Sequence, residues 1–550
     1  MIRRIETAAA VLLTILAAAL HGMRALHAGA LWRDEAGSLQ VAMLPTFGEM
    51  FQRFPHEAFP LLFPATVRSY VGLFGDSDLA LRVFGTAVGL AILGALWLNA
   101  RRAGTVPLAS VALLGFHPAF LIYADTIRGY GLGTLLTLLT FGAYCRLVAR
   151  PDRAAIAAAA VAAILSVHLV LHDSAMVLGL GIAAAVVGAV RRRWRVTAAA
   201  LGAGLLAALT LLPYAGPLRA ARDWDMLIAE GSLTAPQILN SLVESIGSPV
   251  LLWGWVLLLV LGIAGMTVMA RKEEEAGDVR LFRLLAIPAA LAAQYGLFKV
   301  LGYLPKVWYF LPLLALAASA LDGLSASVRD GLGAGLGAGL KIPRLALAAG
   351  LALLLLPAAY REAHVRMTNA DLVASHLEAS VEEGDLVLVN PWFYGVSFHR
   401  YYQGPARWMT VPSLEDHRMH RYDLLKARMA APNDALADVF GAVRRTLRSG
   451  KRVWLAGAYW APAEGERAPV LGPAPGGSHA GWRDGPYVAS WGLQVGALLK
   501  RRAVHEQAVP VPVEGPVNGH EYLLLYELHG WRPRPDTSDI LAAGTERGSR

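Results

Sequence analysis

The chain has 550 residues, of which 55% are hydrophobic and only 17% are charged. With a mean hydropathy of +0.45, this composition excludes an ordinary soluble globular protein and predicts an integral membrane protein. The net charge of +9 does not indicate nucleic-acid binding, because Lys and Arg cluster at the ends of apolar runs, where they orient membrane spans.

The apolar segments of the sequence predict eleven transmembrane helices. Most are close to the roughly 20 residues that a helix needs to cross a bilayer, and the first is interpreted as a retained helix because further spans follow it. The predicted spans cover residues 7–27, 79–100, 106–122, 129–148, 154–171, 174–190, 196–213, 248–269, 281–300, 306–322 and 344–360.

The positive charges support this count, because they fall on alternate connections between the spans. Clusters of Lys and Arg mark the cytoplasmic side of a membrane protein. They occur at Arg3 and Arg4, Arg101 and Arg102, Arg146 with Arg150 and Arg153, Arg191 to Arg193 with Arg195, Arg271 with Lys272, and Lys341 with Arg344. The loop after the first span and everything after residue 360 are therefore expected on the opposite, outer side.

Residues 58–74 are apolar, but they contain two prolines and Arg68 and are short for a membrane crossing. Counting them as a span would also reverse every later positive cluster. We therefore predict a long outer loop over residues 28–78 that carries interfacial helices near 46–54 and 58–74. The glycine-rich run at 331–340 lacks the Lys-Ser/Thr of a phosphate-binding loop and predicts a flexible cytoplasmic linker.

After residue 362 the composition becomes that of a soluble domain. Residues 363–535 are predicted to form a small α/β domain on the outer side, and residues 536–550 a disordered tail. The expected fold class is a polytopic α-helical membrane protein with about eleven spans and this small C-terminal domain. The candidate strands are Asp385–Asn390, Arg452–Gly457 and Glu521–Leu528, helices are expected near 370–380 and 434–448, and residues 462–487 are expected to form a long loop.

Ionisable residues gather in the connections that are expected on the outer side. Charged groups next to hydrocarbon are costly, so their presence in a multi-span protein indicates a functional site. Carboxylates there would supply a base, and cations would hold phosphate. The residues are Asp34, Glu35 and His56 in the first loop, Asp125 and Arg128 in the second, His168, His172 and Asp173 in the third, Arg222, Asp223 and Asp225 in the fourth, and Lys299 and Lys306 in the last.

Five short motifs follow one another between residue 1 and about residue 325. They are Trp32-Arg33-Asp34-Glu35-Ala36, Pro55-His56-Glu57-Ala58-Phe59-Pro60, Leu73 to Arg82, Tyr123-Ala124-Asp125-Thr126-Ile127-Arg128-Gly129-Tyr130, and Lys306-Val307-Trp308-Tyr309-Phe310-Leu311-Pro312. As an ordered set they resemble the GT-C superfamily of membrane glycosyltransferases, in the bacterial branch similar to protein O-mannosyltransferases and lipid A aminoarabinose transferases. The chain departs from the family at Lys306, where Arg is usual, and after His56, where the family often shows His-Pro-Pro.

The resemblance implies sugar transfer on the periplasmic side, from a polyprenyl-phosphate-linked donor to a glycan, lipid or protein acceptor. Inverting transfer needs a carboxylate to take the acceptor's proton and groups that stabilise the departing lipid phosphate. Asp34 is the expected base. Glu35 cannot point the same way, so we expect it to orient the acceptor or to raise the pKa of Asp34 by repulsion, with a solvated side chain as the alternative.

The donor and its phosphate are assigned to Arg128, Lys306 and Tyr130. Asp125 and Arg128 are three residues apart at the start of a predicted helix, so they are expected to share a face. Asp125 would then bind sugar hydroxyls, and a simple ion pair with Arg128 is the alternative. The alternative for Lys306 is a side chain that reaches to the membrane interface.

The sugar or the acceptor is assigned to Asp125, His56 and Trp32. Tyr130 and Trp32 also suit the aromatic belt of a membrane protein, which is the simpler interpretation. No cofactor is predicted, but some members of the superfamily bind a divalent cation, and Asp34, Asp125 and His56 would be its ligands here.

His168 and His172 are four residues apart, with Asp173 adjacent, a spacing that suits a metal site. No Glu lies between the two histidines as in metalloproteases, so interfacial or core histidines are the favoured interpretation.

A transporter or lipid flippase is the competing functional class. Transporters usually contain internal repeats and helices broken at mid-membrane, and no repeat is visible here. The charges also lie at one face while the spans are nearly free of charge, which favours a transferase. A polysaccharide polymerase or ligase would share the lipid-linked donor but would lack the Asp34-Glu35 motif.

Overall fold

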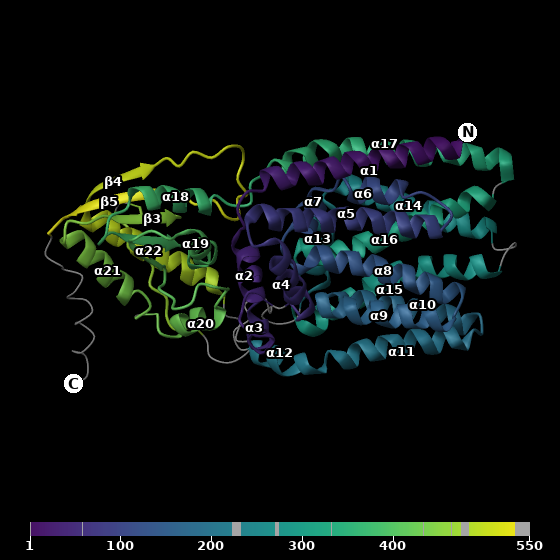
Figure 1. Cartoon of the computed structure of the whole chain (residues 1–550), viewed down its shortest axis with the longest axis horizontal. Coiled ribbons are helices and arrows are strands. Elements are labelled where there is room, and N and C mark those ends of the chain that lie inside the picture. Colours follow the sequence, from purple (N-terminus) through teal and green to yellow (C-terminus); the bar gives the residue numbers. More distant parts are fainter. Residues whose placement is uncertain are drawn as a thin grey trace.

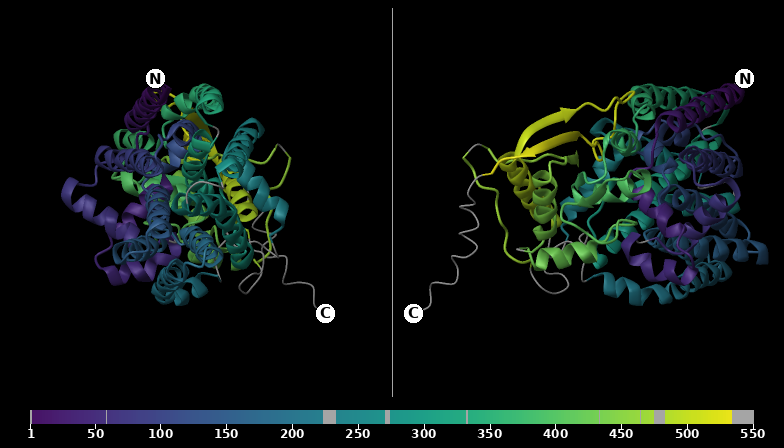
Figure 2. Two further views of the ribbon diagram at one scale, coloured as in Figure 1. Left: turned by 90° about the vertical axis from the view of Figure 1, so that its right-hand side faces the viewer. Right: turned by 60° about the vertical axis from the view of Figure 1, so that its left-hand side comes forward.

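The computed structural model describes residues 2–57, 59–222, 233–269, 274–331, 333–432, 434–463, 465–474 and 483–533. The chain forms a bundle of long helices and, at one end of it, a smaller part built on a five-stranded sheet (Figure 1). The right-hand view in Figure 2, turned by 60°, also shows the two parts end to end.

The helices of the bundle follow the predicted spans closely. They are α1 (Ile2–His27), α5 (Asp78–Arg102), α6 (Leu108–Leu114), α7 (Pro118–Asp125), α8 (Gly129–Ala149), α9 (Arg153–Leu169), α10 (Asp173–Val190), α11 (Trp194–Thr210), η1 (Leu212–Tyr214), α12 (Ala215–Ala221), α13 (Ala235–Ile246), α14 (Pro249–Met269), α15 (Glu274–Leu301), η2 (Val307–Phe310), α16 (Leu311–Gly331) and α17 (Gly333–Ala363).

The chain is a multi-pass membrane protein. Among the described residues, eight helices are long and apolar enough to cross a membrane, and the number is ten if two bent helix pairs each count as one span. The predicted span at 154–171 is the shorter apolar helix α9. The predicted span at 106–122 is wrong as a straight helix, because it consists of α6 and α7, which meet at 81°. Pro118 begins α7 at a position where its missing N–H costs nothing, so the chain starts a new helix there.

The first loop contains three short helices between the bundle and the sheet-bearing part (Figure 1). They are α2 (Arg33–Ala42), α3 (Phe47–Glu57) and α4 (Leu62–Phe74). The helices predicted near 46–54 and 58–74 are therefore confirmed as α3 and α4, and neither belongs to the candidate spans.

The opposite end of the bundle carries the N-terminus and the junction between α10 and α11 (Figure 1). Arginines pair with carboxylates there: Arg344 lies 3.1 Å from Asp322, and Arg193 lies 2.9 Å from Asp278. The flexible linker predicted at 331–340 is wrong for residues 333–340, which belong to α17. Ala and Leu between the glycines supply helix propensity, and the run continues into an apolar helix.

The C-terminal part is an α/β layer structure. Its strands are β1 (Leu386–Asn390), β2 (Arg407–Thr410), β3 (Val453–Gly457), β4 (Ala503–Val509) and β5 (Leu525–Trp531). The sheet order is β2-β1-β3-β5-β4, with β1 parallel to β2 and β3, and β5 antiparallel to β3 and β4. The helices are α18 (Ala370–Ser380), η3 (Trp392–Tyr394), α19 (Gly395–Tyr401), α20 (Tyr422–Ala430), α21 (Ala437–Arg448) and α22 (Asp484–Arg502).

Helices cover both faces of this sheet. Leu386 and Leu388 of β1 pack toward α20, α21 and α22, whereas Val387 and Val389 pack toward α18 and α19. Alternate side chains of a strand point to opposite faces, which explains why the central strands are apolar throughout. Two predicted strands are confirmed as β1 and β3, and the third is shifted, because β5 begins at Leu525. Of the predicted tail, residues 536–550 lie outside the described residues.

Candidate active site between the bundle and the C-terminal domain

The Asp34-Glu35 motif lies in the first turn of α2. The helix begins after Trp32, whose backbone is extended, and both carboxylates lie where the helix dipole favours negative charge. Neighbouring side chains on a helix diverge by about 100°. The two carboxylates consequently have different surroundings.

Glu35 is fully buried and is paired with Arg82 of α5. Arg82 Nη1 lies 2.6 Å from Glu35 Oε1 and Nη2 lies 3.0 Å from Oε2, and the Ile127 N–H donates to Oε1 at 2.9 Å. The expectation that Glu35 raises the pKa of Asp34 is wrong. Arg82 neutralises the Glu35 carboxylate, and the pKa of Asp34 is lowered. The solvated alternative for Glu35 is wrong as well, since its side chain is 0% exposed.

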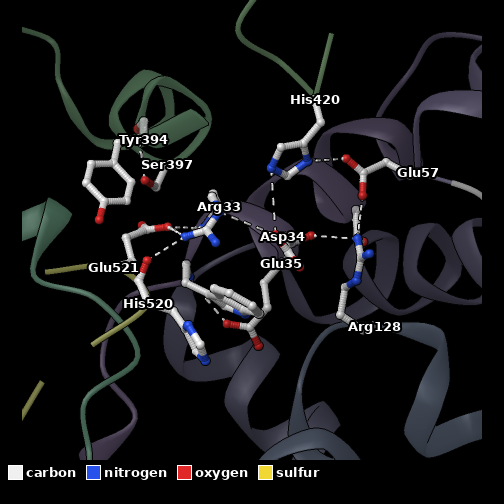
Figure 3. Close-up of polar contacts among 12 residues, drawn as sticks. Arg33, Asp34, Glu35, Glu57, Arg128, Tyr394, Ser397, His420, His520 and Glu521 are labelled. Carbon is white, nitrogen blue, oxygen red and sulfur yellow. Dashed lines mark hydrogen bonds and ion pairs between the residues drawn. The ribbon is translucent and has the colours of Figure 1, made fainter. Parts of the chain in front are cut away.

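Asp34 faces the C-terminal domain and is partly exposed, at 22% of its side chain. Its Oδ1 lies 3.7 Å from Arg33 Nε and 3.7 Å from His420 Nε2 (Figure 3). Burial acts to raise the pKa of this carboxyl, but the charges of Arg128, Arg33 and His420 outweigh burial and lower it. Among the described residues, none donates a hydrogen bond to the Asp34 carboxylate.

Glu57, at the end of α3, lies beside Asp34 and contacts two basic side chains. Arg128 Nη1 contacts Glu57 Oε2, and His420 Nδ1 lies 3.0 Å from Oε1 (Figure 3). Burial acts to raise the pKa of Glu57, but Arg128 and the hydrogen bond from His420 lower it. Gly37 of α2 makes this approach possible, because a Cβ there would lie 2.6 Å from Glu57 Oε1.

Arg128 lies in the break between α7 and α8 and holds the first loop in place. Its Nη1 donates to the Asp34 carbonyl oxygen at 3.1 Å and to Ser38 Oγ at 2.9 Å. Its guanidinium also lies over the rings of Phe59 and Tyr130, 4.6 and 5.8 Å from their centres. Burial acts to lower the pKa of Arg128, but Tyr130 and the carboxylates of Glu57 and Asp34 raise it. The cation therefore stays charged beside Asp34.

Arg33 connects α2 with Glu521 of the C-terminal domain. The Arg33 N–H donates to Glu521 Oε2 at 2.9 Å, and Nη1 donates to the His520 carbonyl oxygen at 2.8 Å. The guanidinium lies 4.8 Å from the centre of the Phe393 ring. Burial raises the pKa of Glu521, and the charge of Arg33 opposes that rise.

The structure does not bring Asp125 to this cluster. Asp125 ends α7 and accepts from His21 Nδ1 of α1 at 2.8 Å, inside the bundle. The expectation that Asp125 and Arg128 share a helix face is wrong, because the helix breaks between them and α8 begins only at Gly129. The ion-pair alternative is wrong too, since Arg128 pairs with Glu57.

The remaining predicted site residues surround the cluster. His56 Nδ1 lies 3.9 Å from Asp423 Oδ1, and burial lowers the pKa of His56 to about 4. The Trp32 ring is buried beside His520 at 6.4 Å. Tyr130 packs against Trp308 at 6.0 Å, and Lys306 is exposed just ahead of η2.

These positions do not gather a metal site. Asp34, Asp125 and His56 do not converge, since each faces a different partner. His168 and His172 are not on one helix, because α9 ends at Leu169. Within the ranges that the structure describes, no group of three or more His, Cys, Asp or Glu is arranged to hold a metal ion. Asp223 and Asp225 lie outside those ranges.

An apolar groove with cationic residues opens next to the cluster. It has a volume of about 270 Å³ and lies between α12, the start of α10 and the end of α15. Arg219, Arg222 and His172 lie among its apolar walls. His172 stacks on Tyr309 at 4.2 Å, and Tyr309 contacts Tyr130 at 5.9 Å. The groove is thus linked through two aromatic rings to the residue pair Tyr130 and Arg128.

Sequence reasoning missed several members of the site. Glu57 belongs to the motif that begins at Pro55. An acidic residue directly after His56, where the family often shows His-Pro-Pro, was the sequence signal for it. Arg82 ends the Leu73 to Arg82 motif, so an arginine in the first turns of a span was a visible signal. His420 and Glu521 carried no sequence signal, because they come from a part of the chain without a matching motif.

No protein-family model matches the sequence, and no curated protein matches it. Two crystal structures of ArnT from Cupriavidus metallidurans are similar to the chain. The apo structure is 14% identical with a TM-score of 0.49, covering 81% of this chain and 92% of ArnT. The structure bound to undecaprenyl phosphate is 12% identical with a TM-score of 0.48, covering 81% of this chain and 93% of ArnT.

Proposed function

We propose that this membrane protein is a glycosyltransferase of the GT-C type. It transfers a sugar from a polyprenyl-phosphate-linked donor to a glycan, lipid or protein acceptor, at the end of the bundle that carries the C-terminal domain. The main support for the proposal comes from the exposure and the surroundings of the Asp34 carboxylate. This carboxylate is partly exposed, its pKa is lowered, and the side chains of Arg33 and His420 are each 3.7 Å away. Its oxygens are therefore ionised at neutral pH and open to a substrate.

In the proposed reaction the acceptor oxygen attacks C1 of the sugar while the bond from C1 to the phosphate oxygen breaks, with inversion at C1. The acceptor's proton passes to Asp34, and the bonding electrons leave with the lipid phosphate. Since Asp34 is ionised at rest, its charge also stabilises the positive charge that develops on the sugar ring. Asp34 returns the proton to solvent when the products leave.

The groove beside the cluster suits the lipid phosphate of the donor. Its walls are mostly apolar, as a polyprenyl chain requires, and Arg219 and Arg222 offer bidentate contacts to a phosphate. Lys306 follows the groove residue Tyr303 on the same short connection. Arg128 is already paired with Glu57, and its positive charge lowers the pKa of Asp34. Lys306, Arg219 and Arg222 are accordingly the proposed phosphate ligands, with Arg128 and Tyr130 beside the sugar.

The same proposal assigns each end of the bundle to one side of the membrane. The arginine-rich connections lie at the end of the bundle away from the sheet (Figure 1). Since such connections mark the cytoplasmic side, the site and the C-terminal domain are assigned to the periplasmic side of a bacterial inner membrane. Lipid-linked sugars are the activated donors suited to that side, where nucleotide sugars are absent.

The test compares Asp34→Asn with the parent in membranes that contain the native acceptors. A polyprenyl-phosphate sugar is supplied, and release of free polyprenyl phosphate is measured. The amide keeps the shape of the side chain but cannot take a proton, so turnover should fall by about 10² to 10⁴, while donor binding stays as in the parent. Asp76→Asn is the matched control, because Asp76 is a largely exposed carboxylate at the same end of the bundle. Turnover of Asp34→Asn at the parent rate would rule out the proposed role.

A further inference from the structure

His420 reaches the site from the C-terminal domain. It lies between β2 and α20, more than 350 residues after the two carboxylates that it contacts. Its imidazole lies between them, with Nδ1 3.0 Å from Glu57 Oε1 and Nε2 3.7 Å from Asp34 Oδ1 (Figure 3). One side chain of the C-terminal domain therefore contacts both α2 and α3.

The surroundings of His420 fix the position of its ring. Tyr422 is nearly parallel to the imidazole, at 5.8 Å and 12°, and Trp392 meets it edge-on at 6.2 Å. The preceding residue, Met419, is fully buried in a small apolar cluster with Val41 and Met50 of the first loop. The segment is thus anchored between α2 and α3 before it presents the imidazole.

The C-terminal domain also holds α2 on the other side of Asp34. Glu521, which is 0% exposed, binds both the backbone N–H and the guanidinium of Arg33. Asp34 consequently lies between two contacts with the same domain, one through Arg33 and one through His420. If His420 only stabilised the core of its own domain, it would not be expected to contact Glu57 and Asp34.

We propose that the C-terminal domain completes the active site, with His420 as a positioning residue for Asp34 and Glu57. This inference rests on the proposed function, because it assigns His420 a role only through Asp34. Two carboxylates at close range repel each other, and an imidazole that donates to Glu57 and faces Asp34 keeps both in fixed places. Without it, Asp34 turns toward Arg33 and Arg128 and away from the acceptor.

Three substitutions of His420 separate its two contacts. In His420→Asn the amide nitrogen replaces Nδ1 and can still donate to Glu57, but nothing reaches Asp34. In His420→Gln the amide nitrogen reaches the place of Nε2 near Asp34, but the bond to Glu57 is lost. His420→Ala removes both contacts. His505→Ala is the matched control, because His505 is exposed on β4 of the same domain.

The measurement is kcat and KM for a polyprenyl-phosphate sugar, together with the thermal unfolding midpoint of each purified variant. We expect kcat of His420→Ala to fall roughly ten- to a hundredfold, the range of one hydrogen bond to a charged group. KM for the donor should stay within about twofold. Each amide variant should recover part of kcat, and His505→Ala should match the parent in both constants.

The outcomes distinguish this inference from the proposed function. If Asp34→Asn loses turnover but His420→Ala keeps the parent kcat, the role of His420 is wrong and the proposed function stands. If Asp34→Asn itself turns over normally, the proposed function fails first. If all three His420 variants lose kcat equally and unfold at lower temperature, His420 is structural and the inference is overturned.

Discussion

Glu35 and Arg82 form a two-point ion pair inside the protein, at 2.6 and 3.0 Å. Arg82 Nη2 also donates to the Ala30 carbonyl oxygen, so the pair ties the start of α2 to α5. Breaking a buried pair by removing one partner costs about 3–5 kcal/mol, because the other charge is left without a partner. Glu35→Gln and Arg82→Met should each lower the thermal unfolding midpoint in detergent. The double variant should lose less than the sum of the two, and strictly additive losses would contradict the pairing.

The acid limb of the pH–rate profile depends on Arg128. A base works in its ionised form, so the rate falls as pH falls through the pKa of Asp34. That pKa is lowered from 3.8, so the parent rate should show no loss on account of Asp34 down to about pH 4. Arg128→Met removes the cation that most strongly lowers the pKa, and its acid limb should move to higher pH.

Arg68→Met serves as the control for the Arg128 profile. Arg68 belongs to α4 at the same end of the bundle and donates to the Leu44 and Pro45 carbonyl oxygens. Its profile should match the parent. An Arg128→Met profile that coincides with the parent over the whole acid range would show that Asp34 is not the titrating base.

Two cations of the groove, Arg219 and Arg222, and Lys306 on the connection that follows Tyr303 should determine donor affinity. Arg219→Ala, Arg222→Ala and Lys306→Ala should each weaken binding of a polyprenyl phosphate by roughly ten- to a hundredfold. A polyprenol of equal length, which has no phosphate, should bind the parent and the variants alike. Arg195→Ala, at the exposed far end of α11, is the control. Unchanged phosphate affinity in all three variants would place the lipid phosphate outside this groove.

Topology can be tested with reporter fusions. Helix α17 ends at Ala363 beside the sheet-bearing part, whereas α10 and α11 meet at the other end of the bundle (Figure 1). A reporter fused after residue 365 should be active only in the periplasm, and one inserted at 191–195 only in the cytoplasm. Activity of both on one side would contradict the arrangement.

Most of the bundle could be predicted from the sequence, because hydropathy and the alternation of charge are local signals. The errors occur where local signals compete. Residues 106–122 are apolar throughout, but Pro118 starts a second helix and bends the segment. Residues 333–340 have the composition of a linker, yet the neighbouring apolar segment extends its helix through them.

The site was predictable only in part. The motif indicates Asp34 as a candidate site residue, and the position at a span end indicates Arg128. Their partners depend on how distant segments pack. Asp125 was expected beside Arg128 from their spacing, but the break after α7 turns it toward His21. His420 could not be predicted, because its role exists only after the C-terminal domain docks on α2 and α3.

The contacts of α2 also determine how the protein can be engineered. A soluble domain after the last span invites treatment as an interchangeable module, to be swapped between relatives to change the acceptor. Here Arg33 and Glu521, and Asp34 and His420, cross the boundary between the two parts. In a chimera with a different C-terminal domain, Arg33 would lose its contact with Glu521 and Asp34 its contact with His420, unless the new domain supplied equivalent residues. The two parts of this chain therefore have to be exchanged, and altered, as one unit.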